Sequence, residues 1–175
     1  MRHEIRLSGS GGQGLITAGI ILARAATLFD SINAVQTQSY GPEARGGASK
    51  SEVIISDGEI NYPKVSAPDV LVALTQEALN KYIKDAKSDA VIIVDSMLVK
   101  VKPQGNYRVY SLPIVQIAAS TVGSIQTANV VTLGALNKIY PLVSDEALTK
   151  TILDIFSAKT AELNIKALKA GSELA

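Results

Sequence analysis

The pattern of apolar and polar residues predicts strands and helices that alternate along the chain. Residues 5–10 are expected to form a first, short strand, and residues 13–29 carry apolar side chains at the 3.6-residue period of a helix. Ile20 and Ile21 interrupt the polar face of this helix. We therefore expect the helix to be covered on more than one side, which hints at a partner surface.

Further segments have the composition of strands: residues 32–38, 51–55, 70–74, 91–94 and 107–112. The first two of these are joined by a loop too short for a helical crossover, so we expect them to run antiparallel. The third and fourth are apolar throughout, as in strands that are buried on both faces. A crossover helix over residues 76–86 fits between them.

The C-terminal part of the chain has a helical pattern. Pro113 can begin a helix over residues 114–121. From Thr127 onward the pattern stays helical, with a break at Tyr140 and Pro141 and with Ser144 as an N-cap. The whole order predicts an α/β fold: one three-layer α/β/α domain over residues 1–175, with a mostly parallel, mixed sheet and a helical C-terminal tail.

A glycine-rich turn separates the first predicted strand from the first predicted helix. Its glycines have the spacing G-x-G-x-x-G, from Gly9 through Gly11 to Gly14. Such a turn exposes backbone N–H groups at the positive end of a helix dipole and can hold a phosphate. The acidic residue that should close the second strand and bind a ribose hydroxyl is missing, and no Lys-Ser/Thr pair follows Gly14. The alternative is that the glycines only permit a tight turn.

Composition excludes several classes of function. The 17 basic and 16 acidic side chains leave a net charge of +1 without a basic run, so we expect no nucleic-acid partner. The chain has no cysteine and one histidine, His3, which we expect to be an exposed terminal residue. It cannot ligate an iron–sulfur cluster, and it has little material for a zinc site or a catalytic triad. No apolar run approaches the ~20 residues of a membrane span, so we expect a cytoplasmic protein without a membrane partner.

Two longer motifs point to a family. The segments GSGGQGLITAG at residues 9–19 and QTQSYGPEARGGAS at residues 36–49 strongly resemble the gamma subunit of 2-oxoacid:ferredoxin oxidoreductases. Shorter matches at residues 69–73, 129–134 and 163–171 extend the resemblance over nearly the whole chain. The loop at residues 40–47 is far more specific than the glycine turn.

The resemblance implies a part of a larger enzyme, which converts a 2-oxoacid, coenzyme A and oxidised ferredoxin to acyl-CoA, CO2 and reduced ferredoxin. Thiamine diphosphate, Mg²⁺ and iron–sulfur clusters are expected on partner subunits, namely alpha and beta, with delta as a further candidate. Ferredoxin is reached through the complex. We expect this chain to hold no catalytic residue and no metal, and to be inactive alone. The Tyr-Gly-Pro-Glu loop favours a 2-oxoglutarate enzyme, with pyruvate and branched-chain 2-oxoacids next and indolepyruvate less favoured.

The resemblance also implies site residues. Coenzyme A is expected at the glycine turn, where backbone N–H groups approach its pyrophosphate or steady its entrance and Arg45 supplies positive charge: Gly9, Gly11, Gly12, Gln13 and Gly14. Contact with the partner subunits is expected from a second set: Tyr40, Gly41, Pro42, Glu43, Gly46, Gly47 and Asn129. Alternatively, Glu43 and Arg45 only pair with each other at the surface. The other class of function left open is a stand-alone Rossmann-like dinucleotide-binding enzyme or a nucleotide-sensing module.

Overall fold

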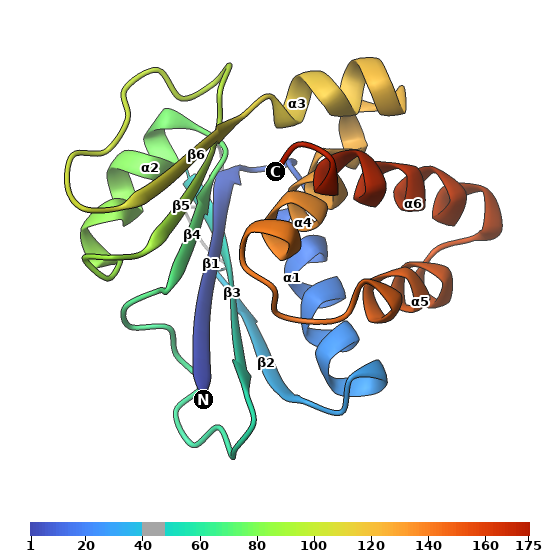
Figure 1. Ribbon diagram of the computed structural model, residues 1–175, viewed down its shortest axis with the longest axis horizontal. Coiled ribbons are helices and arrows are strands. Elements are labelled where there is room, and N and C mark those ends of the chain that lie inside the picture. The colour runs from blue at the N-terminus through green and yellow to red at the C-terminus, as the bar shows by residue number, and fades with distance from the viewer. Residues whose placement is uncertain (40–47) are drawn as a thin grey trace.

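The computed structural model describes residues 1–39 and 48–175, and in this part of the chain six strands form one sheet (Figure 1). Their order across the sheet is β2-β3-β1-β4-β5-β6. The strand bounds are Arg2–Ser10 for β1, Asn33–Gln38 for β2, Ala48–Ser56 for β3, Val70–Ala73 for β4, Val91–Asp95 for β5 and Arg108–Leu112 for β6. All six predicted strands are therefore confirmed, and the predicted bounds fall furthest short of the observed ones for the two longest strands, β1 and β3.

The sheet is mixed because β3 lies between β1 and β2. It runs antiparallel to both neighbours, while β4, β5 and β6 follow β1 in parallel. The expected antiparallel pair is thus confirmed. Because β1 and β2 both run antiparallel to β3, they run in the same direction as each other. The carboxyl ends of β1 and β2 therefore lie at one edge of the sheet.

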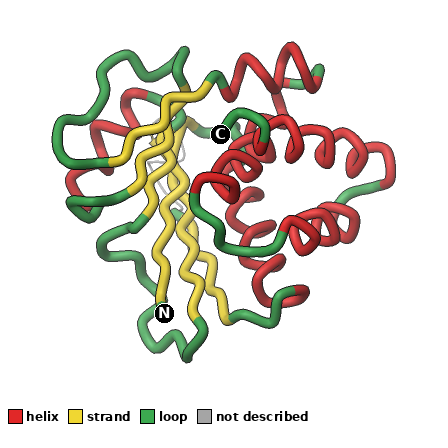
Figure 2. Tube along the Cα trace, viewed as in Figure 1, coloured by secondary structure: helices red, strands yellow, loops and turns green. Residues whose placement is uncertain are grey.

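Helices cover both faces of this sheet, which confirms the three-layer fold (Figure 2). The short α2 (Gln76–Tyr82), extended by the 3-10 turn Ile83–Asp85, lies on one face. On the other face lie α1 (Leu15–Arg24), α4 (Ala128–Ile139), α5 (Asp145–Ile155) and α6 (Ala158–Ser172) (Figure 1). The short α3 (Ile114–Ile117) follows β6, and π-helical turns extend α1 over Ala25–Phe29 and α3 over Ala118–Val122. A 3-10 turn, Ile125–Thr127, leads into α4.

The central strands contribute to two separate apolar cores. Alternate residues of β4 point to opposite faces, so that Val70 and Val72 join the larger core under α1, α4 and α6. Leu71 and Ala73 join the smaller core under α2. This explains why the strand is apolar at every position, as the sequence indicated. Among the described residues, no helix is both long enough and apolar enough to cross a membrane.

The second cover of α1 comes from the chain itself. Ile21 and Leu22 are fully buried, and α1 packs against α4 and α5 as well as the sheet. The expected cover on more than one side is therefore confirmed, and it comes from the helical C-terminal part of the chain, which folds back over the first helix. A partner surface is not needed to explain the composition of this helix.

His3 is not an exposed terminal residue, contrary to expectation. The strand β1 begins at Arg2, so His3 lies within the sheet, where its ring is half-buried. Its Nδ1 lies 2.8 Å from the hydroxyl oxygen of Tyr140, and the two rings meet edge to face. Burial raises the pKa of the Tyr140 hydroxyl above its usual value. The predicted break at Tyr140, after α4, is thus in contact with β1 of the sheet.

The C-terminal helices are joined by one expected break and one unexpected break. Ser144 caps α5, as predicted, because its hydroxyl accepts a hydrogen bond from the Ala147 N–H. A second break falls at Phe156 and Ser157, which adopt an extended backbone. This break lets α6 pack along α4, where Gly134 and Gly171 face the opposite helix: a Cβ added to either glycine would overlap with backbone of that helix.

We expect Gly134→Ala and Gly171→Ala each to lower the free energy of unfolding by about 2 kcal/mol, because the added methyl group forces α4 and α6 apart. Chemical denaturation of the purified protein measures this. Gly58→Ala is the matched control, because a Cβ added there would lie 4.0 Å from the nearest neighbouring atom, the Ser56 Oγ. Equal stability of all three variants would show that the close approach of the two helices contributes little.

Candidate functional site

The glycine turn lies at the carboxyl end of β1, and its residues are exposed from Ser10 to Gly12. Gly12 has a φ of 85°, and a Cβ added there would meet no atom of residues 1–39 or 48–175 within 4 Å. Gly14, with a φ of 75°, is the N-cap of α1. Both glycines adopt the left-handed backbone that other residues avoid. The turn therefore presents its backbone to open space directly before a helix.

Gln13 closes the inner side of the turn with its own side chain. Its Oε1 accepts a hydrogen bond from the Ser10 N–H at 2.8 Å. A Cβ on Gly9 would overlap with this same oxygen. Ser10 and Gln13 both lie before α1, because Ser10 ends β1 and Gly14 is the N-cap of the helix. The N–H of Ser10 is thus occupied, and the groups left for a ligand are those further along the turn.

Asn129, at the start of α4, holds the far end of the turn. Its Nδ2 donates to the carbonyl oxygen of Gly14 at 3.1 Å, and its Oδ1 accepts from the Val130 N–H at 2.9 Å. Only 7% of the residue is exposed. A Cβ on Gly14 would lie 2.7 Å from Nδ2, so this contact also requires glycine. The structure therefore places Asn129 against the coenzyme-binding turn that the sequence predicted, and its contact with another subunit stays a prediction.

The electrostatics of the turn favour an anion. No acidic side chain lies in the first turn of α1, and no side chain caps this helix end. The first N–H groups of a helix have no partner within it and carry the positive end of its dipole. Open glycine backbone and an uncompensated helix end are together suited to phosphate.

A buried carboxylate that the sequence analysis missed shapes the same edge of the sheet. Asp95, at the end of β5, is fully buried, and its oxygens accept hydrogen bonds from the N–H groups of Met97, Leu98 and Val115. The available signal was an acidic residue directly after an apolar strand. Asp95 fixes the loop after β5 and the start of α3.

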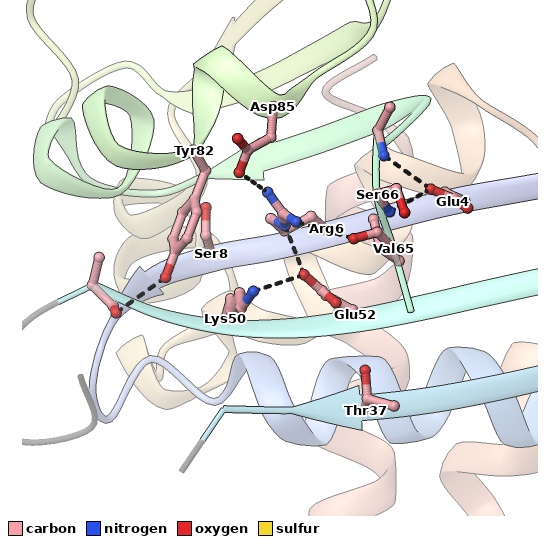
Figure 3. Close-up of polar contacts among 12 residues, drawn as sticks. Glu4, Arg6, Ser8, Thr37, Lys50, Glu52, Val65, Ser66, Tyr82 and Asp85 are labelled. Carbon is pink, nitrogen blue, oxygen red and sulfur yellow. Dashed lines mark hydrogen bonds and ion pairs between the residues drawn. The ribbon is translucent and has the colours of Figure 1, made fainter. Parts of the chain in front are cut away.

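A buried ionic network lies on the opposite face of the sheet from α1 and was also missed (Figure 3). The guanidinium of Arg6 bonds to Glu52 on β3 and to Asp85 after α2, at 2.8 Å each. Lys50 bonds to the same oxygen of Glu52 at 3.0 Å. The ring of Tyr82 stacks beside Arg6, 5.3 Å from the guanidinium carbon. Nothing in the spacing of Arg6 and Glu52 indicates the contact, which depends on the register of β1 against β3.

Several predicted site residues lie outside the described residues: Tyr40, Gly41, Pro42, Glu43, Arg45, Gly46 and Gly47. Their roles, and the alternative of a Glu43–Arg45 pair, stay predictions. The flanking residue Ala48 pairs with Ser10 in the sheet and therefore lies beside the glycine turn. Within residues 1–39 and 48–175, no three histidine or carboxylate side chains cluster so that they could hold a metal ion.

Known proteins resemble this chain over its whole length. It is 51% identical over 177 residues to 2-oxoglutarate synthase subunit KorC of Methanocaldococcus jannaschii, an alignment that covers 100% of this chain and 95% of that protein. The crystal structure of the gamma subunit of keto/oxoacid ferredoxin oxidoreductase from Geobacter sulfurreducens PCA superposes with a TM-score of 0.93, at 49% identity, covering 99% of this chain and 96% of the other.

A longer chain contains the same fold. In the structure of 2-oxoglutarate:ferredoxin oxidoreductase from Magnetococcus marinus with 2-oxoglutarate, coenzyme A and succinyl-CoA bound, the match has a TM-score of 0.88 at 24% identity. It covers 99% of this chain and 31% of that one. The family model of pyruvate ferredoxin/flavodoxin oxidoreductase matches residues 4–174. The extent of this match and the identity to KorC confirm the resemblance seen in the sequence: the chain belongs to the pyruvate ferredoxin/flavodoxin oxidoreductase family.

Proposed function

We propose that this chain is the gamma subunit of a 2-oxoglutarate:ferredoxin oxidoreductase and that its glycine turn receives coenzyme A. The enzyme converts 2-oxoglutarate, coenzyme A and oxidised ferredoxin to succinyl-CoA, CO2 and reduced ferredoxin. The observation that carries the coenzyme role is the open backbone at Gly12 directly before α1. The family is named after pyruvate and does not by itself indicate 2-oxoglutarate. The choice of 2-oxoglutarate is supported by the 51% sequence identity to 2-oxoglutarate synthase subunit KorC.

The chain's own chemistry is binding and orientation. The Gln13 N–H donates to the carbonyl oxygen of Ser10 at 3.4 Å. The other backbone N–H groups of the turn are the donors that we assign to a pyrophosphate, which accepts several hydrogen bonds at once. Gln13 and Asn129 fix the turn from two sides, so the N–H groups keep their directions before a ligand arrives. Arg45 supplies a positive charge toward the same anion. Holding the coenzyme at its phosphates leaves the thiol free to reach a reaction centre on another subunit.

The reaction centre belongs to companion chains in this proposal. Thiamine diphosphate with Mg²⁺ supplies decarboxylation, and iron–sulfur clusters supply electron transfer to ferredoxin. A chain without cysteine cannot ligate such clusters. The companions are an alpha and a beta subunit, with delta as a further member, in a cytoplasmic complex. The loop from Tyr40 to Gly47 contacts the thiamine-bearing subunits with Tyr40 as its anchor, and its glycines permit two backbones to approach closely.

We expect the purified chain, free of other subunits, to show no oxidation of 2-oxoglutarate and no reduction of a pyridine nucleotide. Activity assays with an artificial electron acceptor and with NAD and NADP measure this. The same chain should co-purify with larger subunits from its native cells. Appreciable turnover by the isolated chain, or tight nucleotide binding without partners, would support a stand-alone dinucleotide enzyme or sensor instead.

In the assembled enzyme, we expect 2-oxoglutarate to be oxidised with a higher kcat/KM than pyruvate or branched-chain 2-oxoacids. Assays of each 2-oxoacid with coenzyme A and an artificial acceptor compare them under identical conditions. A preference for pyruvate would place the chain in an enzyme of the other substrate type and leave its role as gamma subunit unchanged.

We expect Gly12→Val to raise the KM for coenzyme A about tenfold, because a β-branched residue strains the left-handed backbone and shifts the turn. Arg45→Ala should raise it as well, through loss of charge. Formation of succinyl-CoA by the assembled enzyme across a range of coenzyme concentrations measures both effects. Gly123→Val is the matched control, with a φ of 92° and equally open surroundings. An unchanged coenzyme response in both variants would remove the turn from the coenzyme site.

A further inference from the structure

The loop that follows β5 exposes three apolar side chains. Met97 is 54% exposed, Leu98 42% and Val101 69%, while Val99 between them is buried in the smaller core. Single apolar residues scattered over a surface are common, whereas a group of them on one short loop marks an interaction site. We call Met97, Leu98 and Val101 together the apolar loop.

The apolar loop leaves the sheet at the level of the glycine turn. Ser8 on β1 pairs with Ala73 on β4, and Ala73 pairs with Val94 on β5. Because these strands are parallel, Ser10 and Ser96 lie at the same height, each two residues beyond that row. The strands β1 and β5 are two strand spacings apart, which is about 10 Å. A macromolecule that covers the apolar loop therefore also borders the glycine turn.

The backbone of the apolar loop is fixed by side chains of the fold. The buried carboxylate of Asp95 accepts hydrogen bonds from the N–H groups of Met97 and Leu98, at 2.8 and 3.0 Å. Gln76 on α2, which the loop passes in Figure 1, accepts from the Val101 N–H at 2.8 Å and donates to the Val101 carbonyl oxygen at 3.0 Å. A partner that binds these apolar side chains orders little further backbone, which lowers the entropic cost of association.

The charges beside the apolar loop are positive. Lys100 and Lys102 are exposed on either side of Val101, and Arg108 is exposed at the start of β6. From residue 96 to residue 144 the sequence contains no Asp or Glu. Protein interfaces combine an apolar centre with a polar rim, and charges at the rim select a partner of opposite sign. The surface thus suits a protein face that has apolar side chains at its centre and carboxylates around them.

A second copy of this chain fits that description poorly. A two-fold contact opposes the same patch in both subunits, so it would bring Lys100 and Lys102 of the two copies together. Like charges placed against each other disfavour association. The occupant is therefore a different protein.

We propose that the apolar loop is a docking surface for the thiamine-bearing companion subunit, which presents apolar side chains ringed by Asp and Glu. This inference rests on the proposed role of the chain as a gamma subunit. The companion is assigned here because its reaction centre has to face the glycine turn, which the apolar loop borders. The interface then extends across the edge of the sheet from β1 to β5.

The test titrates the purified full-length chain into companion subunits that were purified without it. Met97→Asp places a carboxylate against an apolar and acidic partner face, so we expect the dissociation constant to rise about thirtyfold. The double variant Lys100→Glu with Lys102→Glu should slow association and weaken its dependence on salt. Leu153→Asp is the matched control: Leu153 is 57% exposed on α5, over the other face of the sheet, and its replacement should change neither quantity. Thermal unfolding of each variant verifies that the fold is retained.

Three results decide the matter. Wild-type affinity and salt dependence in both the Met97→Asp and the charge-reversed variants would overturn this inference and leave the role of gamma subunit intact. Dimerisation of the isolated wild-type chain that Met97→Asp abolishes would also overturn it, because the apolar loop would then bind a second copy. A wild-type chain that binds no companion subunit would refute the proposed function, and this inference with it.

Discussion

The hydrogen bond from Asn129 to the carbonyl of Gly14 joins the two ends of the chain at the point where the site is built. It ties the first turn of α4 to the N-cap of α1, and α4 is in turn locked to α6 by the glycine contacts at Gly134 and Gly171. The exposed turn is therefore supported by the most closely packed part of the helical layer. The hydrogen bonds of Gln13 and Asn129 hold this loop of small residues at its two ends, while Gly11 and Gly12 between them stay exposed.

Much of the fold could be predicted because its determinants are local. Apolar runs such as residues 91–94 indicate buried strands, and Ser144 indicates the start of α5 through capping chemistry alone. The exposure of His3 was mispredicted because its contact, Tyr140, comes from the far end of the chain. The same limit applies to the cover of α1, which depends on how α4 and α5 fold back.

The site was predictable in its position and less so in its contacts. Gly12 and Gly14 have the left-handed backbone that a glycine turn implies. The internal role of the Gln13 side chain and the tie from Asn129 require knowledge of which atoms meet in space. The ionic network of Arg6, Glu52 and Asp85 is harder to predict than these contacts. Arg6 and Glu52 lie on paired strands, whereas Asp85 follows α2. Isolated charges within a strand resemble solvent-facing residues until the covering element is known.

The hydrogen bond from the Ser10 N–H to the Gln13 side chain has a consequence for the speed of ligand exchange. Because the Gln13 side chain satisfies the Ser10 N–H without any ligand, this hydrogen bond of the turn does not depend on a ligand. A turn that is ordered before binding loses little conformational entropy when a ligand enters. Under the proposed function, the residence time at the turn then depends mainly on how fast the product leaves.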